Sequence, residues 1–314
     1  MRKPTESDGR PELVVLRAIK VGDLLLAVPA LHAIRRANPE HRLILATTGW
    51  LEPLAELIDG LDAFLPQHGL DHPIALERGR VDTVVNLHGR GPQSTDLLDA
   101  LDPRRRVGHR FGERWDGPEW RDGGLERVRW AELVQWHGMP ADPDELWLKD
   151  PGPSANPDAV VVHIGAAYGS RLWPAERFGL VARILEREGG RVLISGGASE
   201  RDRAAHVAEL AGLPEDRIIA GRADLREFAA TVASARLVVT VDTGAAHLAS
   251  AYRTPSVIVF GPAPVEEWGP PAGPHIALTD ASLRRGDGFA DDPDPALLAV
   301  TADDVLAAAR GLLG

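Results

Sequence analysis

The sequence predicts an α/β protein with two doubly wound domains. Short runs rich in valine, isoleucine and leucine alternate with segments of helical periodicity, the loops between them are short, and the pattern begins twice. This alternation is typical of parallel sheets covered by helices on both faces. The chain has 314 residues, about twice the length of a typical domain. We therefore expect domains at residues 1–150 and 151–314, with the last helix able to pack back on the first domain.

The first half contains four apolar runs that predict strands. They span residues 13–16, 42–47, 63–65 and 83–87. Helical periodicity predicts helices at residues 24–34, 51–58 and 93–101. Pro29 lies inside the first of these helices, and because proline lacks a backbone N–H group we expect a kink or a restart there.

A segment without periodicity, residues 149–157, contains three prolines and predicts a linker. The second half then repeats the alternation. Strands are predicted at residues 159–164, 191–195, 217–219, 238–241 and 255–260. Helices are predicted from Pro174 onward and at residues 199–211, 225–233, 245–251 and 302–313. Two similar halves suggest a cleft between them, on which the glycine-rich strand ends of the second half would converge: 165–170, 196–197, 242–244 and 261–262.

Composition argues against several classes of function. Lys and Arg number 35 against 46 Asp and Glu, so the net charge is −11; nucleic-acid binding needs a basic face, and we expect no such partner. There are no cysteines, which removes thiol chemistry and cysteine metal sites. The N-terminal segment is polar, unlike a signal peptide. No apolar run approaches the roughly 20 residues of a membrane helix, so we expect a cytoplasmic protein without a transmembrane segment.

The most informative stretch runs from Val238 to Tyr252. β-Branched residues lead into Asp242-Thr243-Gly244, and small apolar residues of helical character follow. A helix that starts in such a turn presents free backbone N–H groups and the positive end of its dipole, which together bind phosphate. The other interpretation is an ordinary turn capped by Asp242 or Thr243. Neither a Gly-x-Gly-x-x-Gly nor a Walker A motif is present, so a dinucleotide enzyme or a P-loop NTPase is not indicated.

Asp23 is the main candidate in the first half. It follows the first predicted strand, and open α/β sheets place their sites at the carboxyl ends of strands. Its other interpretation is a cap of the following helix. His88 ends another predicted strand, and Lys20 precedes Asp23; both are weaker candidates for contacts with an acceptor.

Two compositional features of the first half are candidates for acceptor or membrane contact. The stretch from Arg104 to Arg114 holds five arginines and one glutamate. We interpret it as a solvated basic loop, with an anionic acceptor site or peripheral membrane contact as the alternative. Five of the eight tryptophans lie between Trp115 and Trp147 at irregular spacing. They predict the packing of a helical subdomain, with an acceptor groove as the alternative.

Four sets of residues together resemble glycosyltransferase family 9, the heptosyltransferase family. In chain order they are Val21-Gly22-Asp23-Leu24 with Pro29-Ala30-Leu31, His163-Ile164-Gly165-Ala166 with Arg171-Leu172-Trp173-Pro174, Asp242-Thr243-Gly244 with His247-Leu248-Ala249, and Phe260-Gly261-Pro262. Their order and spacing are similar to those of the family from about residue 13 to the C-terminus. The resemblance implies the GT-B fold, in which an N-terminal acceptor domain and a C-terminal nucleotide-sugar domain, both Rossmann-like, face each other across a cleft.

The resemblance also implies an activity and a set of roles. Family enzymes transfer a sugar with inversion from a nucleotide donor, typically ADP-heptose, to a hydroxyl group. Asp23 takes the place of the general base, and Arg171 stands where the family commonly has a lysine that neutralises the donor diphosphate. The other implied donor-binding residues are Gly22, Ala166, Ala167, Asp242, Thr243, Gly244, Ala245 and His247. Fixed positive charge and N–H donors can stabilise a leaving diphosphate, so we expect no essential metal and no cofactor besides the donor.

Two other functions are compatible with the same residues. A non-catalytic sugar-nucleotide-binding protein would bind the nucleotide without turnover. A GT-B epimerase or hydrolase of nucleotide sugars would consume the donor without any acceptor. For the transferase, a glycan, a glycolipid and a small molecule all stay open as acceptors.

Overall fold

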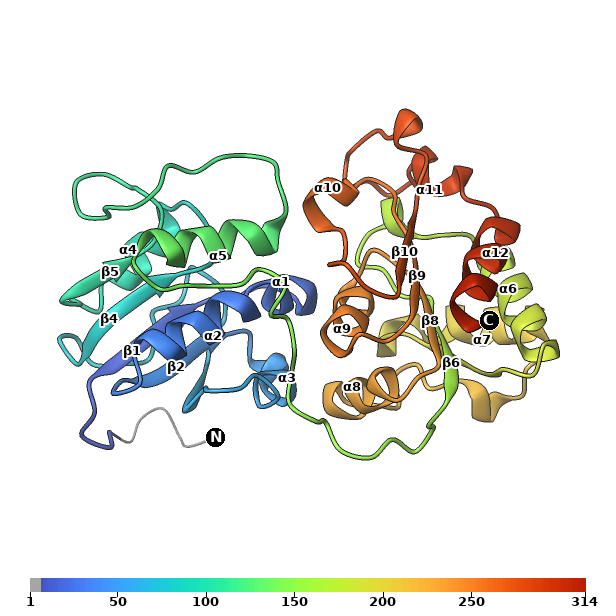
Figure 1. The fold of residues 1–314 in the computed structure, drawn as a ribbon, viewed down its shortest axis with the longest axis horizontal. Helices are drawn as coiled ribbons and strands as arrows, with labels where there is room; N and C mark the ends of the chain where they lie inside the picture. The colour runs from blue at the N-terminus through green and yellow to red at the C-terminus, as the bar shows by residue number, and fades with distance from the viewer. Residues whose placement is uncertain (1–6) are drawn as a thin grey trace. The chain divides into compact units, whose positions relative to one another are not determined.

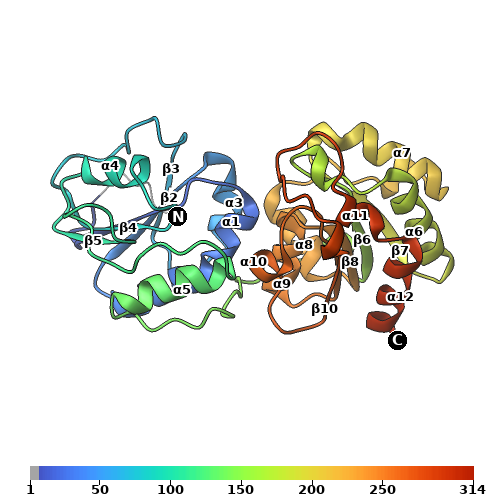
Figure 2. The ribbon, with the colours of Figure 1, turned by 90° about the horizontal axis from the view of Figure 1, so that it is seen from above.

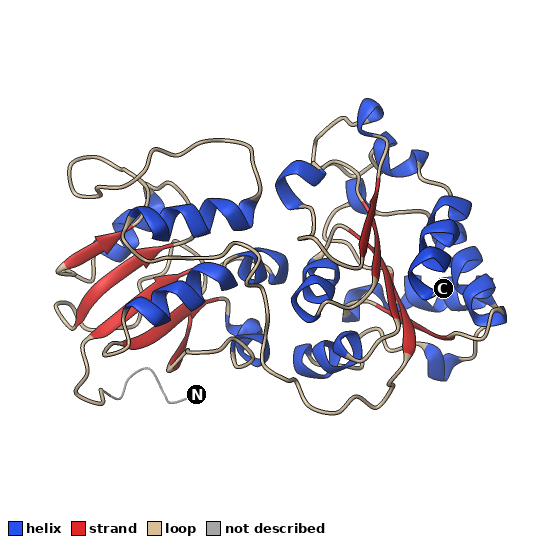
Figure 3. Cartoon of the chain, viewed as in Figure 1, coloured by secondary structure: helices blue, strands red, loops and turns tan. Residues whose placement is uncertain are grey.

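The computed structural model describes residues 7–314, which form two compact units with the boundary between Lys149 and Asp150. Each unit is a five-stranded parallel sheet with helices on both faces (Figures 1 and 3). The boundary falls at the start of the proline-containing segment 149–157. Among the described residues, no helix combines the length and the apolar character needed to cross a bilayer.

The first unit has the strand order β3-β2-β1-β4-β5. Its strands are β1 (Glu12–Leu16), β2 (Arg42–Thr47), β3 (Ala63–Pro66), β4 (Val81–Asn86) and β5 (Arg105–Val107). All neighbours are parallel, with Val14 opposite Ile44 on one side and Val84 on the other. This order reverses between β1 and β4, and open parallel sheets place their binding sites at the carboxyl ends of the strands beside such a reversal.

Five helices cover the first sheet. They are α1 (Val21–Leu26), α2 (Val28–Ala37), α3 (Glu52–Ala55), α4 (Gln93–Asp99) and α5 (Glu126–Trp136). The restart expected at Pro29 is confirmed, because α1 ends at Leu26 and Pro29 occupies the first turn of α2. Helix α2 packs against α5, and α4 and α5 lie on opposite faces of the sheet (Figure 2).

The second unit repeats this design with the order β10-β9-β8-β6-β7. Its strands are β6 (Ala159–His163), β7 (Arg191–Ser195), β8 (Leu237–Val241), β9 (Ser256–Val259) and β10 (His275–Leu278). Its helices are α6 (Ala175–Arg187), α7 (Arg201–Ala211), α8 (Leu225–Ala233), α9 (Gly244–Tyr252), α10 (Val265–Trp268), α11 (Pro295–Ala299) and α12 (Ala302–Leu313). Every residue of β8 is buried, as its β-branched run predicts for a central parallel strand.

The last helix belongs to the core of the second unit. Its residues Val305, Leu306 and Ala309 are buried in the same cluster as α6, α7 and the strands of the second sheet. Within the second unit, its apolar stripe is covered by α6 and by strands β8 to β10.

One predicted strand is not formed, and two strands of the structure were not predicted. Residues 217–219 are not a strand: a 3₁₀ turn spans Glu215–Arg217, and only Ile218 forms a single bridge, with Ile194 of β7. Strands β5 and β10, both at sheet edges, were not predicted. Strand β5 has the sequence Arg-Arg-Val with a single apolar residue, whereas β10 carries a short apolar run, Ile276-Ala277-Leu278, that was not assigned to a strand.

Ion pairs and burial account for part of the arginine stretch and for some of the tryptophans. Arg106 and Arg114 both pair with Asp99, and Arg110 pairs with Asp116 and Glu119, so carboxylates neutralise much of the predicted positive patch. The predicted packing role is confirmed for two of the five tryptophans, Trp115 and Trp130, which are fully buried, whereas Trp136 and Trp147 are about half exposed.

Candidate functional site

The turn between β8 and α9 leaves the N-terminus of the helix open. Thr243 occupies the N-cap position with an extended backbone, but its side chain makes no cap hydrogen bond. Its hydroxyl oxygen instead lies 3.3 Å from that of Thr240. Among residues 7–314, the N–H groups of Gly244 and Ala245 have no acceptor. The structure therefore supports an anion-binding helix terminus rather than a turn closed by Asp242 or Thr243.

Arg171 brings a positive charge to this turn. Its Nη1 donates to Asp242 Oδ2 at 2.7 Å and lies 3.3 Å from the backbone oxygen of the same residue. Asp242 is buried, and its other carboxylate oxygen lies 3.8 Å from His247 Nε2. The Nε atom of Arg171 is also buried and has no hydrogen-bond partner within the described chain. A buried carboxylate thus fixes one corner of the guanidinium, while other N–H groups keep their capacity to bind an anion.

The loop after β6 is held by Glu200, which lies at the end of the 3₁₀ turn between β7 and α7. Glu200 accepts hydrogen bonds from Ala166 N at 2.8 Å and Gly197 N at 2.6 Å. A Cβ atom added at Gly165 would lie only 2.2 Å from its carboxylate. The glycines at these strand ends therefore admit a carboxylate between two loops. Ala167, the next residue, is exposed at the same edge of the sheet.

A C-terminal segment, residues 284–294, forms a wall beside Arg171. Ser170 N donates to Ala290 O at 2.8 Å, and Asp294 N donates to Ser170 O at 3.0 Å. A Cβ added at Gly288 would lie 3.5 Å from Arg171 Nη2. The carboxylate of Asp294 accepts from three backbone N–H groups and so shapes the segment itself. Arg171 is consequently placed by contacts from two distant parts of the chain.

Asp23 occupies the first turn of α1, at the carboxyl end of β1. The N-cap position belongs to Lys20, and no side-chain cap hydrogen bond is formed there. The interpretation of Asp23 as the helix cap is therefore not supported. Its carboxylate is 23% exposed and lies 3.7 Å from the buried guanidinium of Arg17. Gly22 precedes it in the same turn, and Lys20 is exposed beside them.

His88 lies close to Asp23 at the carboxyl end of β4. Burial and then the charge of Arg17 lower the pKa of His88 to about 4, whereas Asp23 opposes this shift. The ring is therefore neutral at pH 7. Its Nδ1 accepts a hydrogen bond from Ala18 N at 3.2 Å, which assigns the ring proton to Nε2. His88 can thus donate a hydrogen bond to a ligand oxygen, but it cannot supply positive charge.

The structure brings the predicted residues together in two sets, one in each unit. Asp23, Lys20, Gly22 and His88 form the first set, and the donor-binding candidates of residues 166–171 and 242–247 form the second. Arg17, Glu200 and Asp294 were not predicted as site residues. Arg17 directly follows the apolar run of β1, and Glu200 lies three residues beyond Gly197 at a Gly-Gly strand end, so both had a local signal; Asp294 had none.

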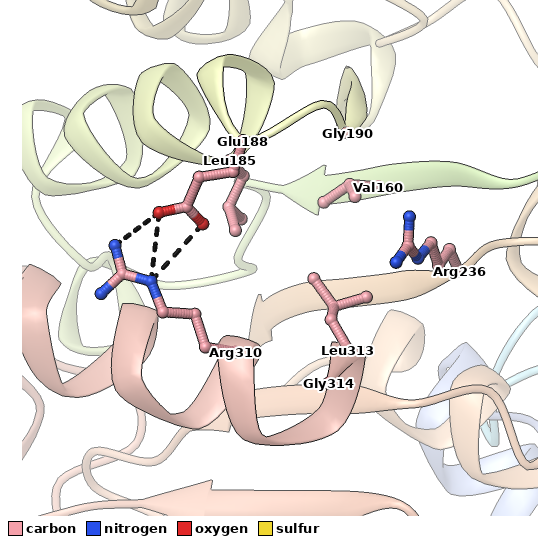
Figure 4. A pocket seen from close by; sticks show the side chains of 8 residues that line it. All are labelled: Val160, Leu185, Glu188, Gly190, Arg236, Arg310, Leu313 and Gly314. Carbon is pink, nitrogen blue, oxygen red and sulfur yellow. Dashed lines mark hydrogen bonds and ion pairs between the residues drawn. The ribbon is translucent and has the colours of Figure 1, made fainter.

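No group of three or more His, Asp or Glu residues that could hold a metal ion occurs among residues 7–314. A cavity of about 210 Å³ lies away from the donor-binding candidates, near the amino end of β6. Its walls include Val160, Leu185 and Leu313, and the ion pair between Glu188 and Arg310 borders it (Figure 4). It contains none of the predicted site residues.

Comparison with known proteins finds a family match over part of the chain. Residues 136–281 match glycosyltransferase family 9 (heptosyltransferase). The chain is 33% identical over 176 residues to lipopolysaccharide heptosyltransferase 1 of Pseudomonas aeruginosa, covering 52% of this chain and 47% of that protein. The aligned part thus spans about half the length of this relative.

Solved structures with low sequence identity share the fold over nearly the whole chain. The ADP-heptose lipopolysaccharide heptosyltransferase II of E. coli matches with a TM-score of 0.77 and 18% identity, covering 96% of this chain and 98% of that one. The E. coli heptosyltransferase WaaC, solved with ADP, matches with a TM-score of 0.69 and 17% identity, covering 96% and 99%. The family match, the curated relative and the shared architecture agree with the resemblance seen in the sequence: this chain is similar to glycosyltransferase family 9 over residues 136–281 and has the GT-B fold.

Proposed function

We propose that this protein is an inverting glycosyltransferase that moves a sugar from a nucleotide donor, with ADP-heptose as the preferred donor, to an acceptor hydroxyl. The observation that carries the proposal is the open N-terminus of α9 beside the guanidinium of Arg171. The diphosphate leaving group gains one further negative charge as the bond to the sugar breaks, and fixed N–H donors with one cation stabilise that charge. The choice of ADP-heptose rests on the relatives, whose names include ADP-heptose and ADP.

In the proposed mechanism, the donor diphosphate binds the N–H groups of Gly244 and Ala245 and the free N–H groups of Arg171. Asp242 orients Arg171 and balances its charge when no donor is bound. Asp23 accepts the proton of the acceptor hydroxyl as the oxygen attacks the anomeric carbon, and the diphosphate leaves from the opposite face. His88 donates a hydrogen bond to the acceptor.

The first experiment is thermal stabilisation by ADP, UDP, GDP and dTDP and by ADP-heptose. A ligand at 100 times its dissociation constant adds about 2.7 kcal/mol to the free energy of unfolding. We expect a shift for ADP and ADP-heptose that is weakened by Arg171→Ala and by Thr243→Ala, and that is unchanged by the exposed control Arg187→Ala. No shift with any nucleotide would contradict the donor site.

The second experiment measures ADP release from ADP-heptose with heptose-deficient lipopolysaccharide as the acceptor. We expect Asp23→Asn to lower kcat by roughly 10²–10⁴-fold, the usual contribution of a general base, and EDTA to leave the rate unchanged. Donor consumption without acceptor would favour an epimerase or a hydrolase. Nucleotide binding without turnover under any of these conditions would favour a non-catalytic binding protein.

A further inference from the structure

Arg17 is a buried cation at the carboxyl end of β1. Its side chain is 1% exposed. Burying an arginine is costly unless the charge is paired and its N–H groups are hydrogen-bonded. The structure meets this requirement with three partners from distant parts of the first unit, and one of them is the residue that we propose as the general base.

Two contacts of Arg17 are directed at Asp23. The Nε atom donates to the backbone oxygen of Asp23 at 3.0 Å. The Nη2 atom lies 3.7 Å from Asp23 Oδ1. The first contact ties down the main chain of the residue. The second is an ion pair too long to be a hydrogen bond, so the carboxylate is attracted to the guanidinium while its lone pairs stay available to accept a proton.

Contacts on the other side hold Arg17 in place. Its Nη2 donates to Glu126 Oε1 at 3.2 Å, and its guanidinium lies 4.6 Å from the ring centroid of the buried Trp130. Trp130 Nε1 donates to the same glutamate oxygen at 2.8 Å. A third contact runs from Arg17 Nη1 to Leu87 O, next to His88. The planar guanidinium is therefore fixed by α5 and by the end of β4 at once.

We propose that Arg17 is a positioning residue, which holds Asp23 in the geometry that catalysis requires. This inference rests on the proposed function, because it acts through Asp23. Only an arginine can satisfy the arrangement, since Nε, Nη1 and Nη2 each have a different partner and the plane stacks on an indole. The same arrangement gives Trp130 a role as support for Arg17.

The test compares Arg17→Lys and Arg17→Met in the wild type and in the Asp23→Asn background. In the ADP-release assay we expect both single variants to lose kcat by about 10–100-fold, since a misplacement of about 1 Å can cost 10²-fold. The KM for ADP-heptose should change by less than about twofold, because all the donor-binding candidates except Gly22 lie in the second unit. In the Asp23→Asn background neither substitution should lower kcat further.

The outcomes separate this inference from the function on which it rests. If Asp23→Asn keeps the wild-type kcat, Asp23 is not the general base, and the proposed role of Arg17 is overturned as well. If Asp23→Asn is inactive while Arg17→Met and Arg17→Lys keep the wild-type kcat, only the positioning role is overturned. A full additional loss in the double variants would also overturn it. Arg78→Met, at an exposed arginine, is the matched control and should keep wild-type activity.

A second measurement does not depend on turnover. Hydrogen exchange of the α1 amides, residues 21–26, should speed up in Arg17→Met, while the amides of α9 should exchange as in the wild type. Unchanged exchange in α1 would overturn the inference. If Arg17→Met does not fold, Glu126→Gln is used in its place. This variant weakens the ion pair that holds Arg17 but keeps the contact between Arg17 and Asp23. We expect a smaller loss of kcat and a smaller increase in the exchange of the α1 amides.

Discussion

Gly169 provides a test of how the second unit places Arg171. An ideal Cβ at this position would lie 1.6 Å from the carbonyl oxygen of Asp291 and 2.4 Å from its carbonyl carbon. These are backbone atoms, which cannot move aside as a flexible side chain can. The substitution Gly169→Ala must therefore push the 284–294 segment away from the turn that carries Arg171.

The expected loss follows from the bonds that this displacement breaks. Two backbone hydrogen bonds join the two segments, Ser170 N to Ala290 O at 2.8 Å and Asp294 N to Ser170 O at 3.0 Å. Each contributes about 1 kcal/mol, and more where a buried group is left without a partner. We expect the free energy of unfolding to fall by about 2–3 kcal/mol. At about 2–4 °C per kcal/mol for a unit of this size, Tm should fall by roughly 4–12 °C.

The assay is thermal unfolding with and without ADP. Gly311→Ala is the matched control: Gly311 lies within α12, nothing lies within 4 Å of an added Cβ, and replacing a helical glycine by alanine adds about 0.5–1 kcal/mol. We also expect Gly169→Ala to reduce the ADP-induced shift, since Arg171 moves with the turn. If Gly169→Ala has the Tm of the wild type, the reasoning from close backbone approach is refuted.

Three further predictions concern stability. Glu12→Gln should lower the free energy of unfolding by about 3–5 kcal/mol in urea denaturation, because it removes the buried carboxylate charge that pairs with Arg42. Asp102→Asn, in an exposed ion pair, should change the free energy of unfolding by less than about 1 kcal/mol, and equal effects would contradict the argument. Thr301→Ala should cost about 1 kcal/mol, because Thr301 and Asp304 cap α12 reciprocally, and an unchanged midpoint would show that the cap is dispensable. Burial lowers the pKa of three histidines to about 4, so between about pH 6.5 and 4 the unfolded chain binds protons that the folded chain does not. The free energy of unfolding should therefore fall as the pH is lowered through this range, by up to about 1.4 kcal/mol per pH unit for each histidine. A free energy of unfolding that stays constant from pH 6.5 to 5 would contradict this. The three are His88, His163 and His275.

Local patterns were sufficient for most of the architecture. The β-branched runs of β1, β4, β6 and β8 mark central strands because such strands are buried on both faces and must be apolar throughout. The restart at Pro29 and the open turn at Asp242-Thr243-Gly244 are also local, since each depends on the backbone chemistry of a few adjacent residues. The edge strand β5 could not be predicted in this way, because only one of its three residues is apolar and its pairing with β4 depends on the sheet.

The sequence by itself predicted the fold class, a resemblance to a glycosyltransferase family and most of the candidate site residues, because these are expressed as short runs with fixed spacing. The tertiary structure alone decided how those residues are held. Arg17 and Glu126 are 109 positions apart, and Arg171 and Asp242 are 71 apart. It also decided that carboxylates neutralise the arginine stretch and that residues 284–294 form a wall beside Arg171. Such contacts form only when the folded chain brings distant segments together, so they leave no periodic pattern in the sequence from which they could be predicted.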